Sequence, residues 1–276
     1  MSDRRSVGIF DSGTGGLTVV RAILDELPFE PVVYFGDHGR FPYGPRPLSE
    51  IRAFAVQIAR HLMEEDVKLI VVACNAATSA ALDEVADAVP VPVVGVIDPA
   101  VRAAARATRN GSVGLIGTQA TVSSGAYQRA FGRVAPEVHV VAQACPLFVE
   151  FVERGDTTSP ALMRAADGYL GPLQEAGVDT LILGCTHYPL LRGAIHHVMG
   201  PGVLLISSAE ETANDVYDVL ASKGLLADPA EGGRDLPVHR FESSGDPSRF
   251  SLLGRRFLGP EFQGAVRVSL ASPGGG

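Results

Sequence analysis

Two cysteines occupy equivalent places in the sequence, each at the end of a short apolar run. Cys74 follows residues 69–73 and Cys185 follows residues 181–184, and polar or small residues come after each thiol. If both runs are parallel strands, the thiols emerge at carboxyl ends, where open α/β sheets bind ligands. A thiol can take up and return a proton near neutral pH. The pair therefore predicts an opposed acid and base.

The neighbours of these thiols favour chemistry over simple packing. A single cysteine is more often a small buried hydrophobic residue than a catalyst. However, Asn75 follows the first thiol, and Thr186 and His187 follow the second. A helix N-terminus and a nearby imidazole would both favour the thiolate. Cys145 has an apolar setting, which predicts a packing role only.

The segment 11–16, Asp-Ser-Gly-Thr-Gly-Gly, lies between an apolar run and a helical pattern. Backbone N–H groups and hydroxyls in such a turn suit a small anion such as a carboxylate. The glycine spacing fits neither a P-loop nor the dinucleotide fingerprint. A tight turn with a helix-capping Ser or Thr is the alternative interpretation.

The segment 35–46 is rich in aromatic, Pro, Gly and charged residues. This composition is typical of a rigid rim that offers backbone and Tyr donors to a ligand. A purely structural loop stiffened by prolines is the alternative.

Composition excludes several classes of protein. The 276 residues are 46% hydrophobic, long enough for one large or two medium domains, and the net charge is -8. Neither nucleic acid nor anionic lipid is an expected partner. Without a secretory segment or a run of roughly 20 apolar residues, the sequence predicts a cytoplasmic protein outside the membrane. The three cysteines lack C-x-x-C spacing, which predicts free thiols.

No cofactor is expected. Pyridoxal phosphate needs an active-site lysine, and the chain has only Lys68 and Lys223. Lys68 begins the strand that leads to the first thiol, at the wrong end of the sheet, and Lys223 resembles a helix C-terminus. A metal site at Cys185 and His187 is disfavoured because C-x-H is not a zinc pattern, and we expect His196 and His197 to face solvent.

Short β-rich runs alternate with segments of helical period, which predicts parallel α/β architecture. The expected strands are 7–10, 32–35, 69–73, 93–96, 113–116, 139–142, 180–184 and 204–206. The expected helices are 16–27, 48–65, 76–89, 99–107, 121–131, 147–153, 160–176 and 209–222.

A weak repeat suggests two copies of one α/β unit. Residues 6–12 parallel residues 112–118, and the two thiols have a similar offset. We therefore expect a first domain at 1–97 completed by 208–270, a second domain at 98–207, and a disordered tail at 271–276. Such twin units would place the thiols on opposite walls of one cleft.

Five sequence blocks carry a resemblance to a known family. In this order along the chain they are residues 7–18, 36–44, 73–75, 144–149 and 184–191, within a matching region from about residue 6 to 220. Together these blocks resemble the glutamate racemases of the aspartate/glutamate racemase superfamily. The Asp-Ser-Gly and Gly-Cys-Thr-His blocks would seldom occur together by chance.

The resemblance implies a cofactor-independent racemase with two pseudo-symmetric parallel-sheet α/β domains and an active site in the cleft between them. It would convert L-glutamate to D-glutamate for peptidoglycan, often as a homodimer. The implied catalytic residues are Cys74, Cys185, Asp11, His187 and Glu153. The implied substrate-binding residues are Asp11, Ser12, Tyr43, Gly44, Asn75, Ala76, Thr118, Thr121, Thr186 and His187.

Three departures from the family pattern bear on substrate preference. Ala76 replaces the usual Thr or Ser, His38 with Gly39 replaces Thr-Ala, and Asp98 replaces Glu. Two alternatives stay open from sequence: a racemase for aspartate or another amino acid, and a catalytically silent amino-acid-binding protein.

Overall fold

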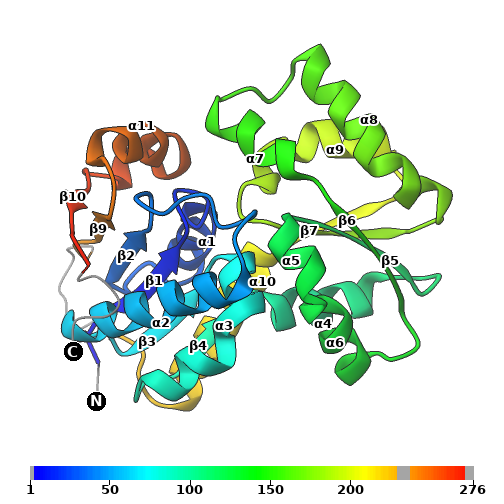
Figure 1. The fold of residues 1–276 in the computed structure, drawn as a ribbon. Helices are drawn as coiled ribbons and strands as arrows, with labels where there is room; N and C mark the ends of the chain where they lie inside the picture. Colours follow the sequence, from blue (N-terminus) through cyan, green and yellow to red (C-terminus); the bar gives the residue numbers. More distant parts are fainter. Residues whose placement is uncertain (1–2, 229–236, 271–276) are drawn as a thin grey trace.

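The computed structural model describes residues 3–228 and 237–270, and the strands in these ranges form two parallel sheets (Figure 1). The first sheet has the order β10-β9-β2-β1-β3-β4. Its strands are β1 (Val7–Asp11), β2 (Val32–Gly36), β3 (Leu69–Val72), β4 (Val93–Gly95), β9 (Arg240–Ser243) and β10 (Val266–Arg267). The second sheet has the order β6-β5-β7-β8. Its strands are β5 (Ser112–Gly117), β6 (His139–Ala144), β7 (Thr180–Gly184) and β8 (Leu204–Ser207).

Helices cover both faces of the first sheet, which explains why its central strands are apolar throughout. In β1, Val7 and Ile9 face one core, whereas Phe10 faces the other. The first core is closed by α1 (Leu17–Glu26), α10 (Ser208–Ser222) and α11 (Pro247–Leu258). The second core is closed by α2 (Leu48–Glu64) and α3 (Asn75–Ala88).

The second sheet is also covered on both faces. One face packs against α7 (Pro146–Glu153), α8 (Pro160–Glu175) and α9 (Arg192–Met199). The other packs against α4 (Ile97–Ala107) and α6 (Ala126–Val134). The short helix α5 (Gln119–Ser124) packs against α3 of the first half.

The two sheets repeat one strand order, because β2-β1-β3-β4 corresponds to β6-β5-β7-β8. This agrees with two copies of one α/β unit. The chain returns after β8, and α10 packs against both α1 and α4 (Figure 1). The four strands of the second sheet fall within 98–207. The domain limits themselves stay a prediction, and the tail 271–276 lies outside the described residues.

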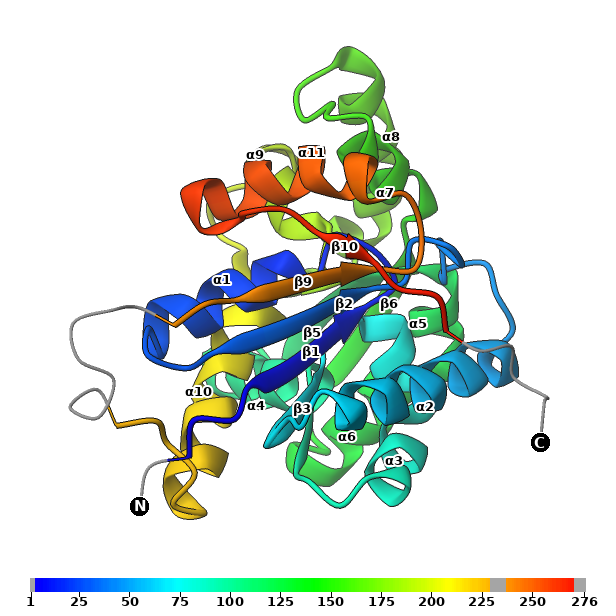
Figure 2. The same ribbon diagram turned by 90° about the vertical axis from the view of Figure 1, so that its left-hand side faces the viewer.

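All eight expected strands are present, and three parts of the structure differ from expectation. The helix expected at 121–131 is divided into α5 and α6 by Gly125, whose φ of 67° is left-handed. A 3-10 turn, η1 (Tyr188–Leu191), follows β7 before α9 begins. The C-terminal elements β9, α11 and β10 extend the first sheet beside β2 (Figure 2). Most of the loop expected at 228–237 lies outside the described residues. No helix in the described ranges is long and apolar enough to cross a membrane.

Candidate active site

A cavity of about 470 Å³ lies where the carboxyl ends of β1 and β3 meet those of β5 and β7. Both thiols line it. The other predicted residues that line it are Ser12, Tyr43, Gly44, Asn75, Ala76, Thr118, Glu153, Thr186 and His187. The remaining two, Asp11 and Thr121, are fully buried and are not among the lining residues. Eleven of the thirteen predicted residues thus line the same cavity.

Cys74 caps the N-terminus of α3, directly after β3. Its Sγ lies 3.8 Å from Ser12 Oγ, and the thiol is only 6% exposed. Burial and the nearby Asp11 carboxylate raise the pKa of Cys74, although a hydrogen bond from the Ala77 N–H and one between the thiol and Ser12 oppose this. The N–H at the helix N-terminus favours the thiolate, as expected, but desolvation outweighs it and the net effect favours the thiol.

Cys185 stands on the opposite wall beside an imidazole. Its Sγ lies 3.9 Å from His187 Nδ1, and His187 Nε2 lies 2.9 Å from Glu153 Oε1. Burial opposes a charge on His187, but hydrogen bonds to Cys185 and Glu153 and the charges of both raise its pKa to about 10. An imidazolium at this position stabilises a neighbouring thiolate. The two thiols thus lie in electrostatically different surroundings.

The segment 11–16 joins the two walls. Asp11 Oδ2 accepts a hydrogen bond from the Gly13 N–H at 3.0 Å, and Asp11 Oδ1 accepts one from Thr186 Oγ1 at 3.3 Å. A Cβ on Gly15 would lie 2.4 Å from Thr186 Oγ1, so only glycine fits there. The alternative of a capping Ser or Thr is wrong, because Gly16 precedes α1 and no side chain caps that helix.

The rim segment is fastened by Asp37, a buried carboxylate that sequence analysis did not single out. It accepts hydrogen bonds from Tyr43 Oη, from Arg40 Nε at 2.7 Å, and from Ser244 Oγ at 2.6 Å. The Gly44 carbonyl accepts a hydrogen bond from the Ala120 N–H of the other half at 2.9 Å. The rim therefore bridges the two halves as well as lining the cavity.

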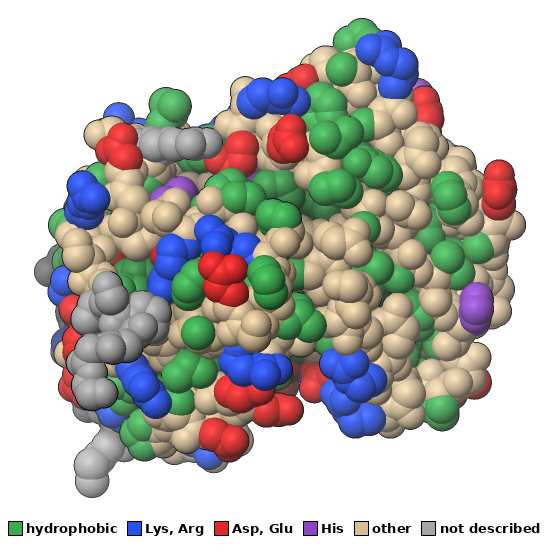
Figure 3. Space-filling model, viewed as in Figure 1, with side chains coloured by type: hydrophobic (Ala, Val, Ile, Leu, Met, Phe, Trp, Pro, Cys, Tyr) green, Lys and Arg blue, Asp and Glu red, His purple; other side chains and the backbone are tan. Residues whose placement is uncertain are grey.

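Apolar residues also line the cavity, beside the polar side chains of Gln119, Glu150 and Arg154. Pro146 and Val149 of α7 line it together with Phe41, and the adjacent Leu147 is 42% exposed. Figure 3 shows hydrophobic side chains gathered on this side of the molecule around α7 and β6, with acidic and basic side chains nearby.

Of the family departures, only Ala76 lies in the cavity wall. Asp98 makes an exposed ion pair with Arg133 at 3.0 Å, and the His38 ring packs edge-on against Phe250. Of the three differences from the family pattern, the missing hydroxyl at Ala76 is therefore the one that can change contacts with a ligand.

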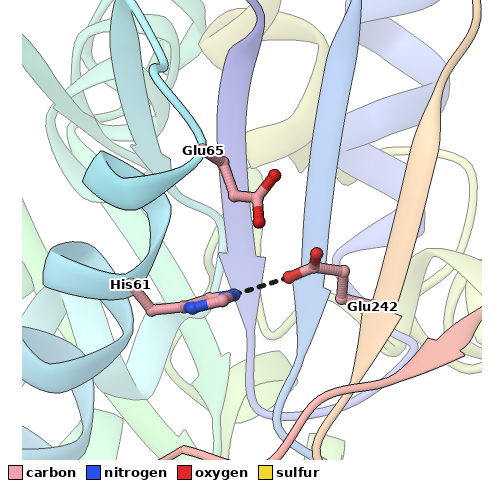
Figure 4. Close-up of side chains that lie close together, drawn as sticks. All are labelled: His61, Glu65 and Glu242. Carbon is pink, nitrogen blue, oxygen red and sulfur yellow. Dashed lines mark hydrogen bonds and ion pairs between the residues drawn. The ribbon is translucent and has the colours of Figure 1, made fainter.

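Within the described residues, the one cluster with metal-ligand geometry is His61, Glu65 and Glu242, between α2 and β9 (Figure 4). His61 Nε2 lies 2.7 Å from Glu242 Oε2. Arg240 supplies a cation to both carboxylates, at 2.7 Å from Glu65 and 2.8 Å from Glu242. The cluster is accordingly a closed ion-pair network, and sequence analysis missed it because its members are far apart in the chain.

The other residues considered from sequence behave as structural groups. Lys68 is buried in an ion pair with Glu30 at 2.6 Å, and Lys223 follows the end of α10. His196 and His197 are exposed on α9, as expected, and Cys145 is fully buried. Neither lysine lines the cavity.

A protein-family model described as Asp/Glu/Hydantoin racemase matches residues 12–216. A glutamate racemase from Beutenbergia cavernae is 56% identical over 269 residues, which cover 95% of this chain and 91% of that protein. The chain belongs to the aspartate/glutamate racemase family. Its place among the glutamate racemases makes it an amino-acid racemase, an isomerase.

The fold of this racemase matches the solved structures of relatives over nearly the whole chain. A glutamate racemase isoform from Bacillus anthracis has a TM-score of 0.90 at 39% identity, covering 98% of this chain and 99% of that one. The glutamate racemase from Francisella tularensis, solved in complex with D-glutamate, has a TM-score of 0.90 at 35% identity with the same coverage. The predicted α/β fold of two parallel-sheet units is confirmed.

Proposed function

We propose that this racemase interconverts L-glutamate and D-glutamate without a cofactor, using Cys74 and Cys185 as its two bases. The observation that carries the proposal is that both thiols line one cavity from corresponding strand ends of the two sheets. A substrate held between them presents one face of its Cα to each sulfur. One fixed group can then remove the Cα proton from one face while the other supplies a different proton to the opposite face.

The local environments set the starting protonation states. The His187 imidazolium favours a thiolate at Cys185, whereas burial beside Asp11 keeps Cys74 a thiol. In one direction the Cys185 thiolate removes the Cα proton, and the electron pair stays on the substrate as a carbanion. The Cys74 thiol then delivers its proton to the opposite face. Cys185 ends as a thiol and Cys74 as a thiolate, and the reverse reaction starts from that state.

The carbanion needs electrostatic stabilisation, because the mechanism uses no electron sink. Donors fixed around the α-carboxylate stabilise negative charge as it develops in a water-poor cavity. Backbone N–H groups that follow Cys74 and Cys185 suit this role, as does the hydroxyl of Ser12. We assign glutamate binding to Asp11, Ser12, Tyr43, Gly44, Asn75, Ala76, Thr118, Thr121, Thr186 and His187. Asp11 and Thr121 act from behind the wall, whereas Glu153 orients His187.

The proposal is tested by hydrogen exchange at Cα. In deuterated buffer the purified protein should place deuterium at Cα of glutamate during turnover, and complete retention of the original hydrogen would overturn the two-base scheme. Cys74→Ser and Cys185→Ser should each lower racemisation by about 10²–10⁴-fold, the usual contribution of general acid–base catalysis. Cys145→Ser is the matched control, because this buried thiol lies outside the cavity wall.

We infer the preference for glutamate from the named relatives, and the role in peptidoglycan supply from the resemblance to the family. Comparing both enantiomers of glutamate and aspartate in one polarimetric assay distinguishes a glutamate racemase from an aspartate racemase. We extend the proposal to the supply of D-glutamate for peptidoglycan by a cytoplasmic homodimer. The three buried free thiols fit a reducing compartment. Light scattering of the purified protein measures the oligomeric state directly.

A further inference from the structure

Tyr127 belongs to the second half of the molecule and contacts a proposed substrate-binding residue of the first. Its hydroxyl, on α6, lies 2.6 Å from Asn75 Oδ1, at the start of α3. Tyr127 is fully buried, and Asn75 is 2% exposed and lines the cavity. Of these two residues, only Asn75 was predicted from sequence, because nothing in the local pattern at position 127 indicates this contact.

The contact fixes which way the Asn75 amide faces. Burial and the nearby Cys185 raise the pKa of Tyr127, so the phenol keeps its proton and can donate it. Asn75 Oδ1 is the acceptor, which leaves the NH₂ group on the other side of the side chain. That Nδ2 is buried and has no hydrogen-bond partner among the described residues. Buried donors without partners are rare in folded proteins and call for an explanation.

We propose that Tyr127 is a positioning residue, which holds the Asn75 amide so that its NH₂ group donates to a carboxylate of the bound amino acid. The inference rests on the proposed function and adds a determinant of substrate recognition from the opposite half. A flipped amide would present oxygen to the carboxylate, and two acceptors repel each other. Tyr127 excludes that orientation because a phenol donor requires the amide oxygen.

Tyr127→Phe removes only the hydroxyl and tests this assignment. We expect KM for glutamate to rise about tenfold, equivalent to one lost hydrogen bond of ordinary strength, while kcat changes by less than about threefold. Tyr169→Phe is the control: this half-buried tyrosine of α8 lies outside the cavity wall, and its KM should stay unchanged. An unchanged KM in Tyr127→Phe would overturn the proposal.

A double-mutant cycle separates positioning from general structural damage. If Tyr127 acts through the amide, Tyr127→Phe should add no further rise in KM to Asn75→Ala. An equal rise in both backgrounds would mean that Tyr127 affects the site by another route. Loss of Cα exchange by the wild-type protein would instead contradict the proposed function, so the two failures are distinguishable.

A spectroscopic measurement on the wild-type protein does not depend on how the variants fold. The chain has three asparagines, at 75, 110 and 214, so selective ¹⁵N labelling gives three side-chain NH₂ signals. Asn75→Ala assigns the relevant one. Saturating D-glutamate should shift the Asn75 signal and slow its exchange with solvent, whereas the signals of Asn110 and Asn214 stay in place. An Asn75 signal unaffected by D-glutamate would refute the inference.

Discussion

Cys74 and Cys185 follow corresponding strands, but their surroundings are not equivalent. Cys74 lies beside a carboxylate, Asp11, whereas Cys185 lies beside an imidazole held by Glu153. A symmetric pair would begin with two thiols, neither of which is a good base at neutral pH. In the proposed mechanism, this asymmetry provides one base and one acid before the substrate binds.

This difference predicts the alkaline limit of activity. The pKa of Cys74 is raised, so Cys74 stays a thiol as the pH rises. The His187 imidazolium beside Cys185 has a pKa raised to about 10 and loses its proton there. The rate constant kcat/KM for glutamate should therefore fall with a midpoint near pH 10. His187→Gln should lower kcat/KM about 10²-fold at pH 7 and abolish this limb.

A pH–rate series on three proteins measures the effect. His196→Gln is the matched control, because His196 is exposed on α9 and lies outside the cavity wall. Its alkaline limb should match that of the wild type. An alkaline limb that persists unchanged in His187→Gln would assign the limb to another group.

Among the candidate catalytic residues, Asp11, Cys74, Cys185 and His187 could be predicted because they lie in local blocks next to strand ends. Glu153 lies at the end of α7 and was implied by the family resemblance alone. Tyr127 and Asp37 were not singled out, since their importance comes from partners 52 and 207 residues away. Such contacts depend on how the two halves pack and leave no periodic signal. The net direction of the Cys74 pKa shift could not be predicted for the same reason, because burial cannot be read from the residues that follow it.

At the scale of elements, the C-terminal strand β9 supports the active-site rim. Ser244, just beyond β9, donates to Asp37 Oδ1 and accepts from the Gly39 N–H at 2.9 Å. Asp37 in turn holds Tyr43, which lines the cavity. The segment from β9 to β10 is distant in sequence from the rest of the site, yet it buttresses one of its walls.

Ser244→Ala should loosen the rim. The hydroxyl bonds to an ionisable carboxyl group, and such hydrogen bonds contribute about 1.5–3 kcal/mol. We expect KM for glutamate to rise about three- to tenfold, with the loss shared between binding and stability. Steady-state kinetics beside Ser222→Ala, an exposed serine of α10, gives the comparison. Equal KM values in the two variants would show that β9 does not support the rim.

The ion-pair network at His61 fastens β9 to α2 and should make stability depend on pH. A hydrogen bond to Glu242, and the charges of Glu242, Glu65 and Glu64, raise the pKa of His61 despite partial burial. A raised pKa means that this contribution is fully present below about pH 6.5 and is lost as pH rises through the folded-state value.

His61→Gln should therefore destabilise the fold by about 1.5–3 kcal/mol at pH 5.5, and by progressively less as the pH is raised above 6.5. Urea unfolding of both proteins at a series of pH values measures the difference in free energy. His197→Gln, an exposed histidine of α9, should show no such trend. A constant difference between His61→Gln and wild type would mean that folding does not change the pKa of His61.

Element by element, the sequence predicted the strands best where they are central and fully apolar. The strands β9 and β10 were missed because they are short and contain charged residues such as Arg240, Glu242 and Arg267. The break at Gly125 was missed because a single glycine inside a helical pattern is usually tolerated. Here it adopts a left-handed conformation that ends α5 and redirects the chain into α6.

At the scale of the molecule, the chain crosses between the two halves twice. It leaves the first sheet after β4 to form α4, and it leaves the second after β8 to form α10. These two helices pack against each other, and Arg102 on α4 lies 2.5 Å from Asp215 on α10. The cavity lies at the carboxyl ends of the strands, where Gly44 and Thr186 make hydrogen bonds between the halves.

A ligand held by both halves should protect both from hydrogen exchange. At a D-glutamate concentration of 100 times Kd, the free energy of unfolding should rise by about 2.7 kcal/mol by mass action. Backbone amides after Cys74 in α3 and after Cys185 in η1 should slow together, because each wall contributes donors to the same molecule. D-Lysine, whose side chain carries the opposite charge, is the control ligand and should protect neither. Mass spectrometry of the exchanged peptides measures both segments in one experiment. Protection confined to one segment would place glutamate against a single wall, and a proton could then not pass from one sulfur to the other through the substrate.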